Sequence, residues 1–412
     1  METITQSIDG SPHYLHDDEL TAAEATLNAI RDIENRSLEI IDRLREDVFA
    51  PDKRKRLELR FTISQAAEMA GRTPTAIRDA EAKGKLPSPE VDENGRRTGY
   101  RLEDVNQMRT YFGTLPWRRD DEEPLVIAVQ NFKGGVGKST TTTHMAQYLA
   151  LRGYRVCVID CDPQASSTTI FGINPDMELT NESTLGPFLG LETESLHSVI
   201  SDTYWPQLKL IPSNLLLNDT EYTLGMAVAG NPHMLQRLRS GVDGIKDQFD
   251  VVLLDPPPAL GMLSLSVLRA ANALIIPVRP ATPDFSSTTA YFTMLRENLE
   301  IMLNHGLPVS FKFIKILVND MSESKSAHVQ ISKMMAQLYG THRFSTVLKD
   351  SAEIDNAAGR MMTVYELDKP LTSRDTHQRC KVYLDGVGRE LETLIRQTWP
   401  SHRESLRREG LI

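Results

Sequence analysis

Apolar residues in the larger, C-terminal part of the chain occur in short and nearly unbroken runs. These runs alternate with stretches whose apolar residues have helical spacing. Strands that are buried on both faces are continuously apolar, and strands that alternate with helices build parallel sheets. The pattern therefore predicts an α/β domain with a mostly parallel, doubly wound sheet over residues 119–412. The six predicted strands are LVIAVQ, RVCVID, LKLIPS, DVVLLD, ALIIPVR and FIKILVN.

Residues 1–55 follow a different pattern, in which apolar residues recur at helical spacing between charged ones. The resulting stripe is narrow enough for a short coiled coil. We therefore expect a helix from about Leu20 to Val48 that mediates dimerisation, with a helix that packs on its own domain as the alternative. The stripe consists of Leu27, Ile30, Ile33, Leu38, Ile41, Leu44 and Val48.

A compact unit follows the basic run DKRKRLELR. Its first part, FTISQAAEMAGRTPTAIRDAEAKGKL, predicts two short helices with a turn at Gly71. Thr73 or Thr75 can cap the second helix. The dipeptide Asn-Gly at 94–95 then marks a hairpin ahead of TGYRL. Two helices followed by a hairpin are typical of a winged helix-turn-helix, and we assign this fold to residues 56–118.

Basic side chains gather on the second predicted helix of this unit and at the tip of its hairpin. In a winged helix-turn-helix these positions contact phosphates and base edges. We therefore expect DNA binding, with a small interaction domain that carries a solvated charged face as the alternative. The unit resembles the MerR-like class of DNA-binding domains. The candidate contacts are Arg72, Thr75, Arg78, Lys83, Lys85, Arg96, Arg97 and Arg101.

Composition and charge exclude several classes of protein. A chain of 412 residues predicts two or three domains. It has no run of 18 apolar residues and begins with an acidic, polar stretch, so we expect neither a membrane span nor a secretion signal. Three cysteines fit a reducing cytoplasm. Because the net charge is −10, contact with nucleic acid must come from local basic patches.

A glycine-rich segment, NFKGGVGKSTTTTHMAQ, directly follows the apolar run LVIAVQ. It matches the phosphate-binding pattern G-x-x-x-x-G-K-[ST] except at the first position, where Phe132 stands in place of glycine. A second lysine, Lys133, comes directly after this phenylalanine and five residues before Lys138. Because strand, loop, Lys-Ser pair and helix occur in the expected order, we predict a nucleotide site.

Each part of this loop has a role in binding phosphate. Gly134, Gly135 and Gly137 let backbone N–H groups approach the phosphate oxygens, and the N terminus of the following helix adds its dipole. Lys138 would reach the β- and γ-phosphates, and the hydroxyl of Ser139 would bind Mg²⁺. The extra lysine has no role in the general pattern.

Two acidic segments accompany the loop. In FDVVLLDPPPALG, an apolar run ends in Asp255, as in the Walker B arrangement, where a strand-tip carboxylate orders Mg²⁺. In VIDCDPQASS, Asp160 and Asp162 follow the second strand and would lie beside the γ-phosphate. One of these two carboxylates could polarise or position the attacking water.

Together these three segments resemble the ParA-type partition ATPases, within the deviant Walker A group that also contains MinD and the nitrogenase iron protein. The loop KGGVGKST is the hallmark of that group, and DCDPQAS and DPPPALG stand where the family has its switch regions. The resemblance covers roughly Leu125 to Leu394. A helix-turn-helix ahead of the ATPase is similar to the larger, plasmid-borne class, which includes the RepA partition proteins of repABC-type replicons.

The resemblance implies roles for individual residues. Lys133 matches the signature lysine, which in the family reaches across a nucleotide-sandwich dimer to the phosphates of the partner subunit. Asp162 matches the residue used for hydrolysis and acts together with Lys133 and Lys138, while Asp160 supports the switch loop. The residues assigned to the nucleotide are Lys133, Gly134, Gly135, Val136, Gly137, Lys138, Ser139, Thr140 and Asn319, and those assigned to the metal are Ser139 and Asp255.

Two further segments are less well defined. Family members place adenine-contacting residues after a late strand, and LVNDMSESKSAHVQ offers Asn319 and Asp320 at that position. The segment DSAEIDNAAG, residues 350–359, resembles a family segment near the nucleotide, with the start of a helix as the alternative.

The resemblance also implies cofactors and partners. These are ATP, Mg²⁺, a second copy of the chain, and a ParB-type (RepB-like) centromere-binding protein that stimulates hydrolysis. Nonspecific nucleoid DNA would be bound in the ATP state, and operator DNA would be bound through the helix-turn-helix to repress the protein's own operon. We therefore expect a cytoplasmic, nucleoid-associated protein.

Two other functions stay open. A MinD-like, membrane-associated regulator would need an amphipathic C-terminal helix, whereas the tail LETLIRQTWPSHRESLRREGLI is interrupted by Pro400 and has scattered apolar residues. A nucleotide-gated transcriptional repressor would use the same two domains without DNA transport. An iron–sulfur reductase would need cysteines on the switch II side. Cys157 and Cys161 instead flank the tip of the second strand.

Overall fold

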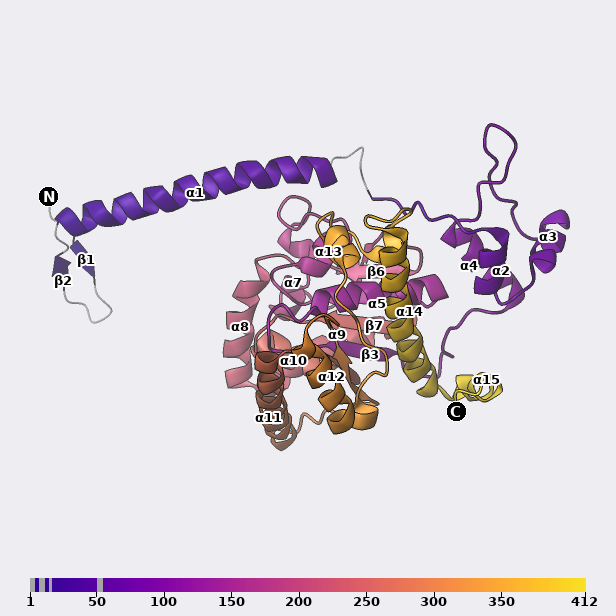
Figure 1. Cartoon of the computed structure of the whole chain (residues 1–412). Helices are drawn as coiled ribbons and strands as arrows, with labels where there is room; N and C mark the ends of the chain where they lie inside the picture. The colour runs from indigo at the N-terminus through magenta and orange to yellow at the C-terminus, as the bar shows by residue number, and fades with distance from the viewer. Residues whose placement is uncertain (1–3, 7–11, 15–16, 50–54) are drawn as a thin grey trace. The chain divides into compact units, whose positions relative to one another are not determined.

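The computed structural model describes residues 4–6, 12–14, 17–49 and 55–412, and it gives side-chain surroundings for residues 21–40 and 55–412. Contacts within the chain divide it into two compact units, Met1–Arg54 and Lys55–Ile412. The helices and strands of both units are labelled in Figure 1.

The first unit consists of a short hairpin and one long helix. Strand β1 (Ile4–Gln6) pairs antiparallel with β2 (Pro12–Tyr14), and helix α1 (Asp17–Phe49) follows. Helix α1 covers the helix that the sequence predicts. Leu27, Ile30, Ile33 and Leu38 of the apolar stripe are exposed, while the side chains of Ile41, Leu44 and Val48 lie outside the described part. Dimerisation through this stripe stays a prediction.

The second unit is built on a seven-stranded sheet with the order β5-β6-β4-β7-β3-β8-β9. All neighbouring strands are parallel except β5 and β6, which are antiparallel. The predicted, mostly parallel α/β sheet is therefore confirmed, with β5 as an added edge strand. The bounds are β3 (Leu125–Val129), β4 (Val156–Asp160), β5 (Ser201–Asp202), β6 (Leu208–Ile211), β7 (Val251–Asp255), β8 (Ala273–Val278) and β9 (Ile314–Val318).

Helices cover both faces of this sheet and create two apolar cores (Figure 1). Along β3, Leu125, Ile127 and Val129 belong to one core, while Val126 and Ala128 belong to the other, as the alternation of a strand requires. The helices are α5 (Lys138–Arg152), α6 (Ser166–Ile170), α7 (Gly186–Leu189), α8 (Leu217–Gly230), α9 (Arg237–Ile245), α10 (Met262–Ala270), α11 (Thr282–Asn304), α12 (Ser326–Tyr339), α13 (Ala352–Ala358), α14 (Arg374–Gln397) and α15 (Arg403–Arg408).

A small group of helices in the same chain, residues 61–113, precedes the sheet. It is called the helical subunit. Its helices are α2 (Ile63–Met69), α3 (Pro74–Ala82) and α4 (Leu102–Phe112). Thr62 opens α2 with a capping box, and the side chain of Thr73 accepts a hydrogen bond from the N–H of Ala76 at the start of α3. Of the two candidate caps, Thr73 is therefore the one used.

The hairpin of the helical subunit is held by a bridge and does not contain the two paired strands of a full wing. A single antiparallel bridge joins Val91 to Arg97. The carboxylate of Asp92 accepts hydrogen bonds from the N–H groups of Asn94 and Arg96, which closes the turn. Gly95, in the predicted hairpin turn, takes the left-handed conformation with φ of 73°.

The helical subunit is packed directly against the sheet domain. The guanidinium of Arg109 on α4 is almost fully buried and donates to the carbonyl of Met69 on α2 and to that of Leu151 at the end of α5, at 3.1 and 2.6 Å. Leu102, the first residue of α4, belongs to the same apolar core as β3 and α5. The two parts therefore share a continuous interior.

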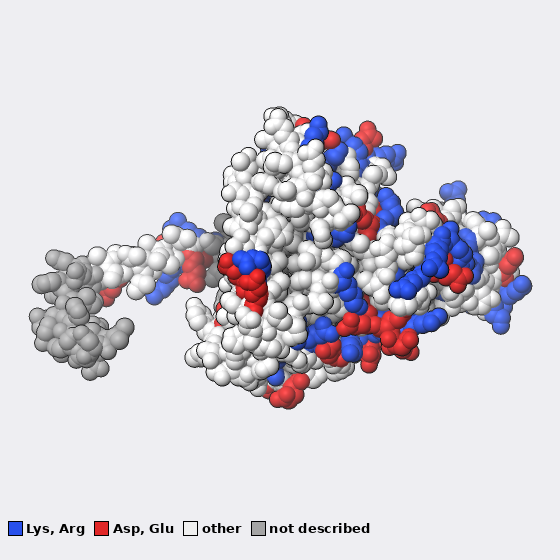
Figure 2. Space-filling model, turned by 90° about the horizontal axis from the view of Figure 1, so that it is seen from below, with Lys and Arg blue, Asp and Glu red and all other residues white. Residues whose placement is uncertain are grey.

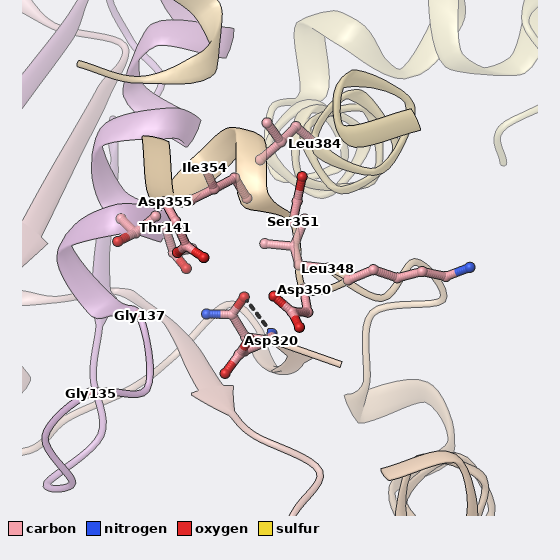
Figure 3. Close-up of a pocket in the computed structure, with 13 residues that line it drawn as sticks. Gly135, Gly137, Thr141, Asp320, Leu348, Asp350, Ser351, Ile354, Asp355 and Leu384 are labelled. Carbon is pink, nitrogen blue, oxygen red and sulfur yellow. Dashed lines mark hydrogen bonds between the residues drawn. The ribbon is translucent and has the colours of Figure 1, made fainter. Parts of the chain in front are cut away.

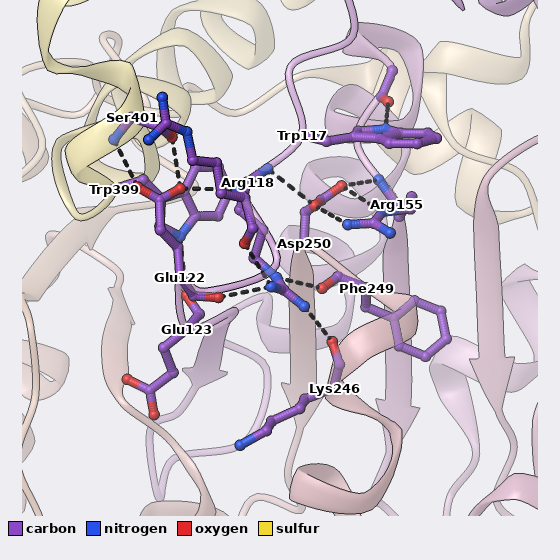
Figure 4. A network of polar contacts seen from close by, with 12 residues as sticks. Trp117, Arg118, Glu122, Glu123, Arg155, Lys246, Phe249, Asp250, Trp399 and Ser401 are labelled. Atoms are coloured by element: carbon purple, nitrogen blue, oxygen red, sulfur yellow. Dashed lines mark hydrogen bonds and ion pairs between the residues drawn. The ribbon is translucent and has the colours of Figure 1, made fainter.

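The segment that connects α4 to β3 is also fixed to the sheet domain (Figure 4). The indole of Trp117 donates to the carbonyl of Gly153. The buried guanidinium of Arg118 donates to the carbonyls of Phe249 and Lys246, while its backbone N–H donates to the carboxylate of Asp250. Such a segment is a structural part of the domain and not a free linker.

Candidate functional site

The predicted nucleotide-site residues lie at the carboxyl ends of the central strands β4, β7 and β3 and of the edge strand β9. The phosphate-binding loop follows β3, Asp160 ends β4, Asp255 ends β7 and Asn319 comes directly after β9. Asp160 and Asp255 are direct neighbours in the register of β4 and β7. This edge is where open α/β sheets bind their ligands, because strands of one direction bring their following loops together.

The glycines of the loop are required by its shape. Gly135 and Gly137 have φ of 72° and 84°, in the left-handed region. A Cβ atom at Gly137 would lie 2.1 Å from the amide nitrogen of Asn319. That amide donates to the carbonyl of Val136 at 2.8 Å. Asn319, assigned to adenine from the sequence, is thus joined to the phosphate loop.

Lys138 is the first residue of α5 and is almost fully buried. Its ammonium group lies 3.4 Å from the carbonyl oxygen of Lys133. Burial lowers the pKa of Lys138, and the nearby carboxylates of Asp255 and Asp162 oppose this shift. A buried cation at the N terminus of a helix, inside a loop of exposed N–H groups, is suited to bind an anion.

Asp255 is fully buried at the tip of β7. The hydroxyl of Ser167 donates to its Oδ2 atom at 2.7 Å, whereas its Oδ1 atom has no hydrogen bond within the described structure. Burial raises the pKa of Asp255, and hydrogen bonds from Ser167 and Ser139 oppose this shift. An unpaired, buried carboxylate oxygen beside the hydroxyl of Ser139 is a fitting ligand for a cation.

Asp160 and Asp162 have different surroundings, although both follow β4. Asp160 is fully buried and accepts three hydrogen bonds, from the N–H of Asp162 and from the N–H and hydroxyl of Thr168. Burial, followed by the charge of Asp255, raises the pKa of Asp160 well above its usual range. Asp162 accepts one bond, from the N–H of Gln164 at 3.0 Å. Asp160 therefore organises the loop, and Asp162 keeps a carboxylate oxygen available.

The start of the loop lies against helix α11. The ammonium group of Lys133 forms an ion pair with Asp284 in the first turn of this helix. The ring of Phe132, which replaces the usual glycine, packs on Tyr291 with 4.8 Å between ring centroids. Sequence reasoning missed both α11 residues because neither belongs to a motif.

A cavity of about 190 Å³ adjoins the loop (Figure 3). Carboxylates of Asp320, Asp350 and Asp355 line it beside Thr141. Burial raises the pKa of Asp355, and the charges of Asp350 and Asp320 add to this effect. The full lining is Gly135, Gly137, Thr140, Thr141, Asn319, Asp320, Leu348, Lys349, Asp350, Ser351, Ile354, Asp355 and Leu384.

In the segment 350–359 the structure confirms the start of a helix, whereas its nearness to the nucleotide stays a prediction. Ser351 caps α13 through a hydrogen bond from the N–H of Glu353, so the segment does start a helix. Its residues Asp350, Ser351 and Asp355 also line the cavity beside the loop. Thr141 and Leu384 were missed, since an apolar residue on α14 carries no signal for a binding site.

Comparison with known proteins identifies the family. Residues 125–304 match a family described as an AAA domain. A protein of Rhizobium rhizogenes named replication protein A is 31% identical over 366 residues, which are 85% of this chain and 90% of the relative. The protein SopA of Escherichia coli strain K12 is 34% identical over 326 residues, which are 77% of this chain and 83% of the relative. This chain belongs to the ParA family of partition ATPases.

The fold of this ParA-family chain agrees with that assignment. A solved structure entitled partition protein has a TM-score of 0.65 and 20% sequence identity, and the match covers 89% of this chain and 98% of that one. At this identity the likeness concerns the fold alone. Membership of the family makes the chain an ATPase, which converts ATP and water to ADP and phosphate, and places it in ATP-driven DNA segregation.

The candidate DNA contacts of this ParA-family chain fall into two groups. Arg72 donates to the carbonyl of Phe112 and lies over its ring, and Arg97 forms an ion pair with Glu81 at 2.9 Å. Arg101 likewise forms an ion pair with Glu90 of the helical subunit. The remaining candidates are exposed, with no side-chain hydrogen bond or ion pair in the described part of the chain: Thr75, Arg78, Lys83, Lys85 and Arg96.

Charge elsewhere on the surface is mixed. Figure 2 shows Lys and Arg side chains interspersed with Asp and Glu on the face that it presents, beside a broad area without charged groups. No helix among the described residues combines the length and apolar character that crossing a membrane requires. The three cysteines are buried and unpaired, and within the described residues no cluster of His, Cys, Asp or Glu could hold a metal ion by itself.

Proposed function

We propose that this ATPase moves DNA by an ATP-gated cycle of dimerisation. In this cycle ATP assembles two protomers face to face, and the assembled state binds nucleoid DNA without sequence preference. A ParB-type, RepB-like protein bound at a centromere stimulates hydrolysis, which separates the protomers. The observation that carries the proposal is the pair of lysines in one loop, because Lys138 is buried beside the carboxylates while Lys133 is partly exposed at the rim.

Lys138 and Lys133 serve different subunits in this proposal. Lys138 is held inside the loop with the N–H groups of Gly135 and Gly137, where it offsets the charge of the phosphates bound by its own protomer. Lys133 reaches the phosphates of the partner subunit. A cation that arrives only when two protomers meet couples assembly to the nucleotide.

Ser139 and Asp255 are the residues that would hold Mg²⁺. Their fit rests on the unpaired Oδ1 atom of Asp255 and on the hydroxyl of Ser139 beside it. Mg²⁺ favours oxygen ligands and is commonly held by one or two protein groups together with phosphate oxygens and water. When bound, the ion neutralises charge on the β- and γ-phosphates.

Asp162 is the group that positions the attacking water. Its carboxylate accepts one hydrogen bond at the described geometry, from Gln164, and retains capacity for another donor. Asp160 is fully engaged by Thr168 and by the backbone of Asp162, so it supports the position of Asp162 instead. Remaining loop residues, Val136 and Thr140 included, complete the phosphate site together with Gly134.

The helical subunit would bind operator DNA and repress the operon, with Thr75, Arg78, Lys83, Lys85 and Arg96 as contacts. What supports this role is that these polar side chains are exposed on α3, on the turn after it and on the hairpin. Arg72 and Arg97 have intramolecular partners and are weaker candidates. The apolar stripe of α1 would join two chains in the state without ATP.

The first experiment is steady-state ATP turnover by the full chain, alone, with nonspecific duplex DNA and with anionic lipid vesicles. We expect a basal rate well below about 10 s⁻¹, the median for enzymes, that rises on addition of DNA. Stimulation by lipid instead would place the chain with MinD-like regulators. Turnover unaffected by DNA, with nucleotide-dependent operator binding, would favour the nucleotide-gated repressor, for which the exposed cations of the helical subunit are the supporting observation.

A further inference from the structure

We propose that Asp284 withholds Lys133 from the partner subunit and thereby sets how readily ATP assembles two protomers. The proposal rests on the proposed function, since it concerns the lysine that acts in the partner subunit. It assigns a positioning role to an acidic residue that lies outside all motifs of the nucleotide site.

The contact that carries this inference is the ion pair between the ammonium group of Lys133 and Oδ1 of Asp284. The side chain of Asp284 is 11% exposed, whereas that of Lys133 is 36% exposed. The carboxylate is therefore the largely buried partner, and the lysine, with its longer and more exposed side chain, is the one that can exchange partners. Asp284 also lies in the first turn of α11, where the helix dipole favours a negative charge when the lysine leaves.

The backbone beside Lys133 is held in place by three contacts. The side-chain oxygen of Asn131 accepts the N–H of Lys133 at 3.0 Å, and the side-chain nitrogen of Asn131 donates to the carbonyl of Pro277 at 2.9 Å. The ring of Phe132 packs on Tyr291. Exchange of partners is thus confined to the flexible side chain of Lys133.

One face of α11 binds both residues at the head of the loop. Asp284, Thr288 and Tyr291 are spaced by four and three positions, so they share a helix face, and all three are buried. Tyr291 packs on Phe132 while Asp284 pairs with Lys133. This explains the departure from the general pattern at position 132: a glycine there would remove the ring that anchors the loop on α11.

Asp284 and the partner's phosphates compete for one ammonium group. Lys133 cannot pair with Asp284 in its own protomer and reach across a dimer interface at the same time. ATP in a facing protomer offers a larger negative charge than one carboxylate, so it draws the lysine away, whereas a protomer without ATP leaves the ion pair intact. Removing the carboxylate should therefore favour assembly.

The test compares Asp284→Asn with the intact chain. Assembly is followed by light scattering over a range of protein concentrations, with Mg²⁺ and a non-hydrolysable ATP analogue. We expect half-maximal assembly at a protein concentration about two- to fivefold lower, the range for loss of a partly exposed ion pair. In a Lys133→Ala background the same substitution should have no effect. Glu300→Gln is the matched control, because it removes an exposed ion pair with Arg296 on the same helix.

The opposite result would overturn the proposal. If Asp284→Asn weakens assembly as Lys133→Ala does, the carboxylate orients the lysine toward the partner instead of withholding it. Asp284→Glu keeps the negative charge, so this variant should assemble at a protein concentration close to that of the intact chain. No shift in Asp284→Asn would also contradict the proposed role.

A second readout separates this inference from the proposed function. Labelling of nucleotide-free protein with an amine-reactive acetyl ester, followed by peptide mass spectrometry, measures access to Lys133 in the single protomer. We expect faster labelling of Lys133 in Asp284→Asn and unchanged labelling of Lys246. Unchanged labelling of Lys133 would refute the ion pair. Failure of the intact chain to assemble with ATP would instead refute the proposed dimer and leave the labelling result standing.

Discussion

The nucleotide edge of the sheet and the helical subunit both carry many charged residues, but they hold them in opposite ways. At the edge, Lys138, Asp160 and Asp255 are buried. In the helical subunit, Arg78 and Lys83 are exposed and without intramolecular partners in the described structure. A buried charge is costly unless it has a partner or a ligand, so its presence indicates function more strongly than an exposed charge does.

This difference ranks the expected effects of substitutions. Side chains at the edge act at short range, out of bulk water, and each should have a large effect when changed. Exposed cations of the helical subunit act through water and salt, and each should have a small effect. Substitution of Asp162, Lys138 and Arg78 tests this ranking.

The largest effect should follow substitution of Asp162 by alanine. Loss of the group that we propose positions the attacking water should lower kcat by about 100-fold to 10,000-fold, while nucleotide binding and the melting temperature stay near those of the intact chain. Single-turnover hydrolysis of ATP measures the change. Retained turnover in the presence of DNA or of a centromere-binding partner would refute the assignment. Asp160→Ala should differ by lowering stability, since it leaves three hydrogen-bond donors without their acceptor.

The next effect in size should come from Lys138→Ala. Removing the buried ammonium group takes away charge-assisted bonds to two phosphates, so nucleotide affinity should fall by about 100-fold. Titration with a fluorescent ATP analogue at low protein concentration gives the affinity. Lys246→Ala is the control, because Lys246 is half-exposed and pairs with Asp243 away from the site. Equal losses in the two variants would show that general charge, and not the loop, determines binding.

His144 on α5 should make stability depend on pH. Its Nε2 atom accepts the N–H of Val364 and its Nδ1 atom faces the carbonyl of Thr140, and burial lowers its pKa to about 4. A histidine whose pKa is lowered in the folded state stabilises the fold above its unfolded pKa near 6.5, and this contribution is lost as the pH falls toward 4. Between pH 7.5 and 5 the loss should be about 2 kcal/mol.

Urea unfolding at pH 7.5 and pH 5 measures this contribution as the change in unfolding free energy. In His144→Gln the pH dependence should decrease by that amount, whereas the exposed His233, replaced by Gln, should leave it unchanged. An equal pH dependence in the intact chain and in His144→Gln would contradict the prediction.

The smallest effect should follow substitution of single exposed cations in the helical subunit. Arg78→Ala should weaken binding to duplex DNA about three- to tenfold, as expected for loss of one phosphate or base contact. Arg97→Ala should instead lower stability, because it breaks the ion pair with the buried carboxylate of Glu81. Fluorescence anisotropy with labelled duplexes at two salt concentrations measures DNA binding by the Arg78→Ala and Arg97→Ala variants. If Arg78→Ala lowers DNA affinity by as large a factor as Lys138→Ala lowers nucleotide affinity, the expected difference between exposed and buried charges is contradicted.

The fold was predictable from the sequence wherever a strand consists of an unbroken run of apolar, buried residues. The six apolar runs of the sheet became parallel strands, and four of them, β3, β4, β7 and β8, are buried along their whole length. Strand β5 was missed, since a two-residue edge strand leaves no periodic signal. In the helical subunit, residue 73 and not residue 75 became the cap, a choice that depends on where the first turn begins.

The candidate site was predictable where its residues belong to short motifs that follow a strand. The phosphate-binding loop and three carboxylates directly follow strands whose carboxyl ends lie on the same side of the sheet. The carboxylates are those of Asp160, Asp162 and Asp255. Asp284 and Tyr291 were not predictable, because they contact the loop from a helix far along the chain and only the folded structure brings them together. The same holds for Leu384, which reaches the cavity from α14.

The contact of Arg109 with the end of α5 has a consequence for the evolution of the chain. Gly153 follows α5 with φ of 97°, and a Cβ atom there would lie 2.9 Å from the guanidinium of Arg109. Gly153 of the sheet domain and Arg109 of the helical subunit are therefore closely fitted to each other. Recombination that exchanges either domain for a distant homologue must keep this pair matched, so the two domains are expected to be inherited together.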